Sequence, residues 1–211
     1  MSDPHLPDFV FETAKNRVVI YPDRVVKTFK RTRRSARHSQ REAAALRRLQ
    51  GLPGVPTLLD VSTDGHTLVM TRVPGVSLAD GGTLTEQHLL DLRALVEQML
   101  LRGVARHSLP KRDILLGEDG SIGLVDFERS TQRLFAADPV WPVACVVARF
   151  NILRLVNGYA PHLLTADEQA WLGRQVGIRA TLQHPLRFRR WLFRVLGLTP
   201  AGGSSARGKP G

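Results

Sequence analysis

Short apolar runs separated by turn-forming residues occupy the first third of the chain. The runs RVVIY and RVVKTF are rich in β-branched residues, and Pro22-Asp23 between them favours a tight turn. Alanines and leucines then recur at helical spacing until Gly51 ends the pattern. Two more β-rich runs follow, with Asp64-Gly65 as the turn between them. The pattern predicts strands at 17–21, 24–29, 56–61 and 66–72 and a helix at 35–50.

After Gly75 the pattern becomes mainly helical. Thr85 is a suitable N-cap for a run of leucine, valine and methionine at helical spacing, which Gly103 ends. The glycine- and serine-rich residues 201–211 are expected to be disordered. The other predicted elements are a helix at 84–101, strands at 114–116 and 121–127, and further helices between 139 and 198.

These elements predict an α+β protein with two lobes. After a loose N-terminus at 1–8, residues 9–75 form a small β-rich lobe with one main helix, and residues 76–200 form a mostly helical lobe. A cleft between two such lobes is a common position for a ligand. The residues that carry chemistry are therefore expected near the junction of the lobes.

The net charge narrows the choice of partner. Thirty lysines and arginines, 25 of them arginine, oppose 19 acidic residues and give a formal charge of +11. An anionic partner is expected, such as a phosphate-bearing substrate, a nucleic acid or an anionic membrane surface. Cys145 is the single cysteine, which excludes a disulfide-stapled secreted module. The first residues contain no signal-peptide pattern, so a cytoplasmic location is expected.

A lysine in a predicted strand and a glutamate in the next predicted helix suit the requirements of phosphoryl transfer. That reaction needs a cation on the phosphates, a carboxylate that orients the cation, and groups that bind a metal ion. Lys27 and Glu42 supply the first two. Taken singly, Lys27 is more simply explained as a solvated lysine, and Glu42 as half of a helical ion pair.

Residues 103–128, GVARHSLPKRDILLGEDGSIGLVDFE, resemble the catalytic segment of the protein-kinase-like fold. The similarity is greatest to the small bacterial lipopolysaccharide (Kdo) kinases, and it extends over roughly residues 17–155. The residues that match in register are Gly103, Val104, Leu109, Ile114, Leu115, Asp126 and Phe127.

The resemblance implies a two-lobed kinase-like fold that uses ATP and Mg²⁺. It places Lys27 at the position of the phosphate-binding lysine, Glu42 at that of its helical partner, and Asp126 at that of a metal-binding aspartate. Met70 and Arg72 fall on the strand that leads into the nucleotide-binding hinge.

Two positions depart from the pattern of that family. Ser108 stands where the family has its catalytic aspartate, and a hydroxyl does not accept the substrate proton near neutral pH as a carboxylate does. Asp113 stands where the family has a metal-binding asparagine, so Asp113 and Asp126 would form a two-carboxylate Mg²⁺ site. Asp113 could also take over part of the missing aspartate's role. In addition, residues 9–21 contain no glycine-rich loop.

Two regions concentrate positive charge. Residues 24–48 contain ten lysines and arginines and a single acid, Glu42, and are expected beside the cleft. Residues 184–198 predict a basic amphipathic helix of the kind found at membrane interfaces. Nucleic acid is the less favoured partner, because aromatic residues are only 6% of the chain and no nucleic-acid-binding motif is present. Alternatively, the first region is a solvated loop and the second packs on the helical lobe.

Three hypotheses follow from these observations. The first is an ATP-dependent phosphotransferase that acts on an anionic substrate, such as a lipopolysaccharide sugar or a protein hydroxyl, at the inner face of a membrane. Asp126 and Asp113 would bind Mg²⁺, and Ser108 would lie beside the acceptor. The second is a pseudokinase that binds nucleotide or a protein partner without catalysis, and Ser108 favours it. The third is a basic adaptor for a membrane or a nucleic acid.

Overall fold

The computed structural model describes residues 6–182 of the chain, with side chains as far as residue 174. The predicted basic helix at 184–198 and the predicted disordered tail at 201–211 lie outside the described residues. The chain divides into two compact units, residues 1–165 and 166–211, and helix α4 (Ala166–Leu182) is the described element of the second. The candidate site lies entirely within the first unit.

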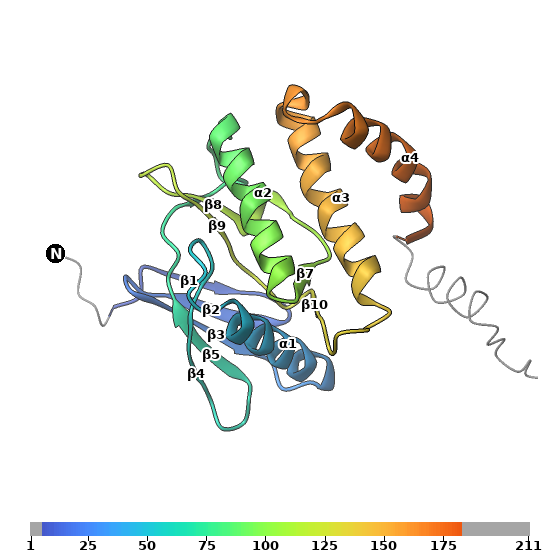
Figure 1. The fold of residues 1–211 in the computed structure, drawn as a ribbon. Helices are drawn as coiled ribbons and strands as arrows, with labels where there is room; N and C mark the ends of the chain where they lie inside the picture. The colour runs from blue at the N-terminus through green and yellow to red at the C-terminus, as the bar shows by residue number, and fades with distance from the viewer. Residues whose placement is uncertain (1–5, 183–211) are drawn as a thin grey trace, which may run out of the picture. The chain divides into compact units, whose positions relative to one another are not determined.

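A five-stranded antiparallel sheet forms the N-terminal part of the first unit (Figure 1). Helix α1 (Arg33–Leu49) packs on it through a side rich in alanine and leucine, and Thr32 caps the helix by accepting a hydrogen bond from the Ser35 backbone N–H. The β-β-α-β-β order expected from the sequence is confirmed, with one additional strand before it. In spatial order the strands are β1 (Phe9–Glu12), β2 (Asn16–Ile20), β3 (Arg24–Phe29), β5 (Thr67–Thr71) and β4 (Leu58–Val61).

Two long helices dominate the C-terminal part of the first unit. Helices α2 (Glu86–Leu101) and α3 (Trp141–Tyr159) pack against each other and against strand β7 (Val104–Arg106). As expected, Thr85 caps α2, because its hydroxyl accepts a hydrogen bond from the His88 backbone N–H. No helix in the described part of the chain is long and apolar enough to span a bilayer.

Short strands connect the two parts and position the loops between them. Strand β7 pairs with β10 (Ser130–Gln132), while β6 (Val76–Ser77), β8 (Ile114–Leu116) and β9 (Ile122–Leu124) form a separate small sheet. The single turn of 3₁₀ helix η1 (Lys111–Asp113) leads into β8, and η2 (Pro161–Leu163) follows α3. The strand predicted at 121–127 is shorter in the structure, where β9 ends at Leu124. The chain leaves the extended conformation here, because Asp126 has a positive φ of 66°, which lies outside the β region.

Candidate functional site

Three charged side chains from distant parts of the sequence meet at the junction of the sheet, α1 and the segment after β9. The Lys27 ammonium on β3 lies 2.7 Å from Glu42 Oε2 on α1 and 2.9 Å from Asp126 Oδ1. Lys27 and Glu42 are buried, with 6% and 1% of their surfaces exposed. Because buried charges require partners, this arrangement is a specific one rather than a surface ion pair.

Local backbone structure directs Asp126 toward Lys27. Asp126 is the one residue other than glycine with a positive φ among those described, a conformation that aspartate tolerates better than most residues but at a cost of about 1–3 kcal/mol. The next residue, Phe127, is fully buried, and its backbone N–H donates to Glu42 Oε1 at 3.3 Å. Glu42 therefore holds both the lysine and the backbone that carries Asp126.

The electrostatics of the cluster favour charged forms of Lys27 and Asp126. Burial alone disfavours the Lys27 ammonium, but the two carboxylates outweigh it and raise the pKa of Lys27. Burial also acts to raise the pKa of Asp126, yet the charge and hydrogen bond of Lys27 hold that pKa below its ordinary value. The pKa of Glu42 is raised by its complete burial, which Lys27 opposes. The Asp126 side chain is 32% exposed, so it is the member of the cluster that solvent or a ligand can reach.

A second ion pair, which the sequence did not predict, holds Asp113 beside this cluster. The Arg106 guanidinium contacts Asp113 Oδ2 at 2.5 Å and donates to the Val125 carbonyl at 2.8 Å. Its central carbon lies 5.2 Å from the centre of the Phe127 ring. Both members of the pair are at least nine-tenths buried. Burial raises the pKa of Asp113, an effect that Arg106 opposes and the nearby Asp126 reinforces.

The two oxygens of Asp113 have different partners. Oδ2 is engaged by Arg106, whereas the partner of Oδ1 is the exposed Arg112, whose Nε lies 3.4 Å away. Within residues 6–182 no group of three or more metal-ligating side chains is present. Mg²⁺ is commonly bound by one or two carboxylates together with substrate phosphates, so Asp113 and Asp126 fit that ion only in the presence of a phosphate ligand.

Ser108 lies in the exposed loop between β7 and η1. The loop is anchored on the N-terminal side of Ser108 by His107: the Asn151 side chain donates to the His107 carbonyl at 2.9 Å, and the His107 ring contacts the Thr131 hydroxyl at 2.7 Å. In the described part of the chain, no carboxylate forms a hydrogen bond with Ser108. Asp113, the acid considered as a replacement for the missing aspartate, is directed to Arg106 instead.

An apolar surface covers the cluster from the side of the sheet. Strand register places Val25 and Met70 opposite each other and Val18 opposite Lys27, so these side chains share the face of the sheet that carries Lys27. Phe9 and Phe11 lie on the same face, with ring centres 6.2 Å apart, and each is more than half exposed. Such a face suits the flat apolar surface of a nucleobase.

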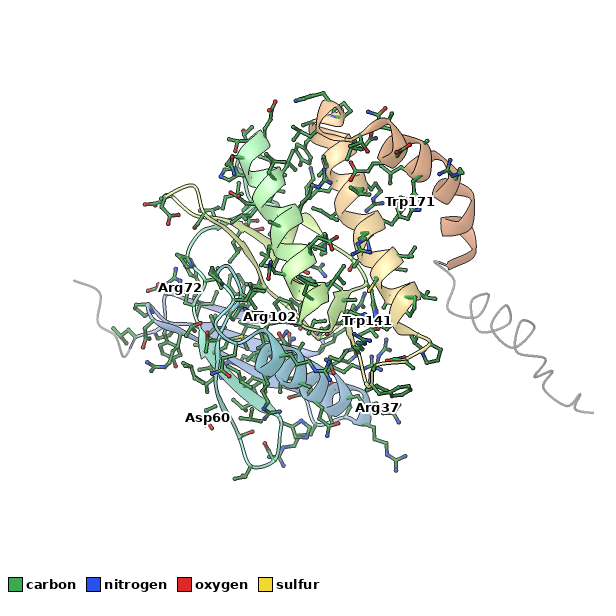
Figure 2. All side chains as sticks on the ribbon, viewed as in Figure 1. Arg37, Asp60, Arg72, Arg102, Trp141 and Trp171 are labelled. Atoms are coloured by element: carbon green, nitrogen blue, oxygen red, sulfur yellow. The ribbon has the colours of Figure 1, made fainter. Side chains whose placement is uncertain are left out.

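The polar contacts of Arg72 lie outside the Lys27 cluster. Its guanidinium pairs with Asp8 and donates to the Tyr21 carbonyl at 3.2 Å, and Figure 2 shows it at the border of the sheet. The residue also lines a groove of about 570 Å³ between the strand β5 exit and α2. Sequence reasoning also did not identify Lys15 as a residue near the site. Its ammonium, in the β1–β2 turn, lies 3.5 Å from the carboxylate of Glu128, which is two residues after Asp126.

Comparison with known proteins supports this interpretation of the fold. No family model matches the sequence, and no curated protein matches it. Among solved structures, WbdD superimposes with a TM-score of 0.53 at 18% identity, covering 71% of this chain and 37% of WbdD. A complex of WbdD with the kinase inhibitor LY294002 gives 0.52 at 20% identity, covering 86% of this chain and 42% of the other.

The Rio2 kinase of Chaetomium thermophilum, in its ADP/Mg²⁺-phosphoaspartate complex, superimposes with a TM-score of 0.56 at 14% identity. The superposition covers 90% of this chain and 70% of the Rio2 chain. The chain spans about two fifths of the length of the WbdD chains that it matches. At these identities the similarity establishes architecture and nothing finer. The predicted two-lobed α+β architecture is confirmed: the chain has a protein-kinase-like fold.

Proposed function

We propose that the protein binds ATP with Mg²⁺ and transfers the γ-phosphoryl group to a hydroxyl of an anionic substrate. The observation that carries the proposal is the Lys27 ammonium, buried and held between Glu42 and Asp126 at 2.7 and 2.9 Å. A fixed lysine next to a partly exposed aspartate provides a phosphate-binding cation and a metal-binding anion in one place. The kinase-like fold of the chain agrees with this use of the site.

The residues have distinct tasks in this proposal. Lys27 contacts the phosphates, and Glu42 keeps the ammonium oriented. Asp126 and Oδ1 of Asp113 would hold Mg²⁺, which would neutralise charge on the phosphates when bound. The apolar face with Val25 and Met70 would cover the base.

Ser108 affects the rate rather than the course of the transfer. The acceptor oxygen bonds to the γ-phosphorus while the bond from that phosphorus to the ADP oxygen breaks, and the acceptor proton passes to solvent. A loose transition state depends mainly on positioning and electrostatics, so transfer proceeds without a carboxylate at position 108. A missing general base typically lowers the rate by about 10²–10⁴-fold.

Slow transfer distinguishes this proposal from the second candidate, a pseudokinase that binds nucleotide without turnover. Ser108 and the Arg106–Asp113 pair favour that candidate, because they remove one carboxylate and engage another. The test is ATP turnover by the wild type, Asp126→Asn and the matched control Asp60→Asn. Asp60 is exposed on β4 and is labelled in Figure 2.

Phosphotransfer predicts turnover that Asp126→Asn abolishes and Asp60→Asn preserves. Nucleotide binding without Asp126-dependent turnover would instead establish the pseudokinase. The acceptor is proposed to be anionic because the chain carries a net charge of +11, with ten cations between residues 24 and 48.

A further inference from the structure

The connection between β10 and α3 presents bulky apolar side chains to solvent. Leu134 and Phe135 are 76% and 57% exposed, and Val140, just before α3, is 56% exposed. Single exposed apolar residues are ordinary, but two adjacent large ones form a small contiguous apolar patch, which makes this connection a candidate interaction site.

Polar contacts fix the backbone of this connection. The buried Asp138 carboxylate accepts hydrogen bonds from the backbone N–H groups of Leu134 and Val140, each at 3.0 Å. The Arg133 guanidinium donates to the carbonyls of Phe135, at 3.2 Å, and Ala136. The exposure of Leu134 and Phe135 is therefore a consequence of an organised turn and not of a loose segment.

Arginines of α1 border the same connection. Strand β10 packs against α1, and the Gln132 side chain donates to the Arg41 carbonyl at 2.8 Å. Arg48 donates to the Gly103 carbonyl at 3.3 Å, and Gly103 in turn accepts from the backbone N–H of Arg133 at 2.9 Å. Arg37, labelled in Figure 2, lies one helical turn before Arg41 on the same side of α1.

The arginines that α1 contributes to this area have no acidic partner among the described residues. In the described part of the chain, Arg37, Arg41 and Arg48 form no ion pair. The one acidic residue of α1 is Glu42, which is buried and paired with Lys27. Burial together with the charges of Arg41 and Arg129 lowers the pKa of His107. Like charges at helical spacing repel one another, so the area favours an anionic partner. We call Leu134, Phe135, Arg37, Arg41, Arg48 and Arg133 the basic–apolar surface.

We propose that the basic–apolar surface docks the protein onto an anionic lipid bilayer, with Leu134 and Phe135 inserted among the lipids and the arginines on the phosphate headgroups. Phe135 could stack on a base, but Leu134, which is the more exposed of the two, has no stacking partner in a nucleic acid. Both side chains gain free energy on entering the acyl boundary of a membrane. Guanidinium groups around it match the negative potential of such a membrane. This proposal does not depend on phosphotransfer.

The first test is co-sedimentation of the full chain with vesicles of phosphatidylcholine alone or mixed with phosphatidylglycerol. Wild type is expected to bind the mixed vesicles, and salt is expected to weaken that binding. Leu134→Ser with Phe135→Ser should lower the partition coefficient at least about tenfold, because two large apolar side chains lose their burial. Arg37→Gln with Arg41→Gln should also lower it roughly tenfold.

A matched control separates local docking from general hydrophobicity. Leu59→Ser removes a side chain on β4 that is 54% exposed and should leave vesicle binding unchanged. All variants are first compared by thermal unfolding, because every substituted side chain is exposed and no loss of folding is expected. Unchanged vesicle binding in the Leu134/Phe135 variant overturns the proposal. The proposal is also overturned if binding to RNA or to an acidic polypeptide depends on these residues while binding to vesicles does not.

A site-specific label gives a second, independent readout. Cys145 is the single cysteine, so Leu134→Cys in a Cys145→Ser background accepts one polarity-sensitive fluorophore. Mixed vesicles should shift its emission to the blue, and the same label at Leu59→Cys should not respond. An unresponsive label at position 134 contradicts insertion even if the protein sediments with the vesicles.

Discussion

Replacing Arg106 by methionine tests how the second ion pair contributes to the protein. The substitution keeps most of the apolar volume but leaves the Asp113 carboxylate, 6% exposed, without its closest cation. Removing one partner of a buried pair typically destabilises a protein by about 3–5 kcal/mol. Since whole domains are stable by only about 5–15 kcal/mol, the effect would be large.

Urea unfolding of matched variants measures this effect. Arg106→Met with Asp113→Asn removes both charges and should recover at least about 2 kcal/mol relative to Arg106→Met alone. Arg149→Met breaks a half-exposed pair with Glu97 on α2 and should cost no more than about 1 kcal/mol. Equal losses for Arg106→Met and Arg149→Met would refute the assignment of a buried pair.

The same variant has a predictable pH dependence. Burial already raises the pKa of Asp113, and without Arg106 the pKa should rise further. An acid with a raised pKa in the folded state binds its proton more readily there than in the unfolded chain. The stability deficit of Arg106→Met should therefore shrink as pH falls through that pKa, while the deficit of the double variant with Asp113→Asn should not change.

Two further predictions concern the backbone and Asp126. Gly54→Ala should lower the free energy of unfolding in urea by about 2–4 kcal/mol, because φ is +78° and the new Cβ would lie 2.5 Å from the Ile122 carbonyl oxygen. The control Gly65→Ala, at φ +69° with open space around it, should lower it by only about 1 kcal/mol. Because Lys27 holds the pKa of Asp126 below its ordinary value of 3.8, the contribution of that contact is complete above this pH and is lost as pH falls through the folded-state pKa. Acid unfolding of Asp126→Asn should lack that step.

The sequence predicted the long elements and one part of the candidate site. Helical spacing identified α1 and α2 because their apolar sides repeat over four or more turns. The spacing of Lys27, Glu42 and Asp126 could be compared with a known pattern, and the structure brings these residues together. Their roles in nucleotide binding, like that of Met70, remain predictions.

The Arg106–Asp113 pair was beyond such reasoning for a physical reason. Its two residues are separated by a loop of six residues, and their contact depends on the path of that loop, which has no periodicity. The neighbouring strands β7 and β10 have three residues each, too few for alternation to be recognisable. The sequence did contain one indication of the pair. Arg106 directly follows the apolar residues Val104 and Ala105, and an arginine that is buried with such residues requires a carboxylate partner.

Nucleotide-dependent thermal stabilisation tests the central claim, that the Lys27 cluster binds ATP with Mg²⁺, most directly. With ligand at a hundred times its dissociation constant, wild type should gain about 2.7 kcal/mol, which corresponds to a rise in Tm of roughly 5–10 °C for a chain of this size. Lys27→Met should show no such rise, and Asp60→Asn should retain it in full. A wild type that ATP and Mg²⁺ do not stabilise, or a Lys27→Met variant stabilised as strongly as the wild type, would contradict the account.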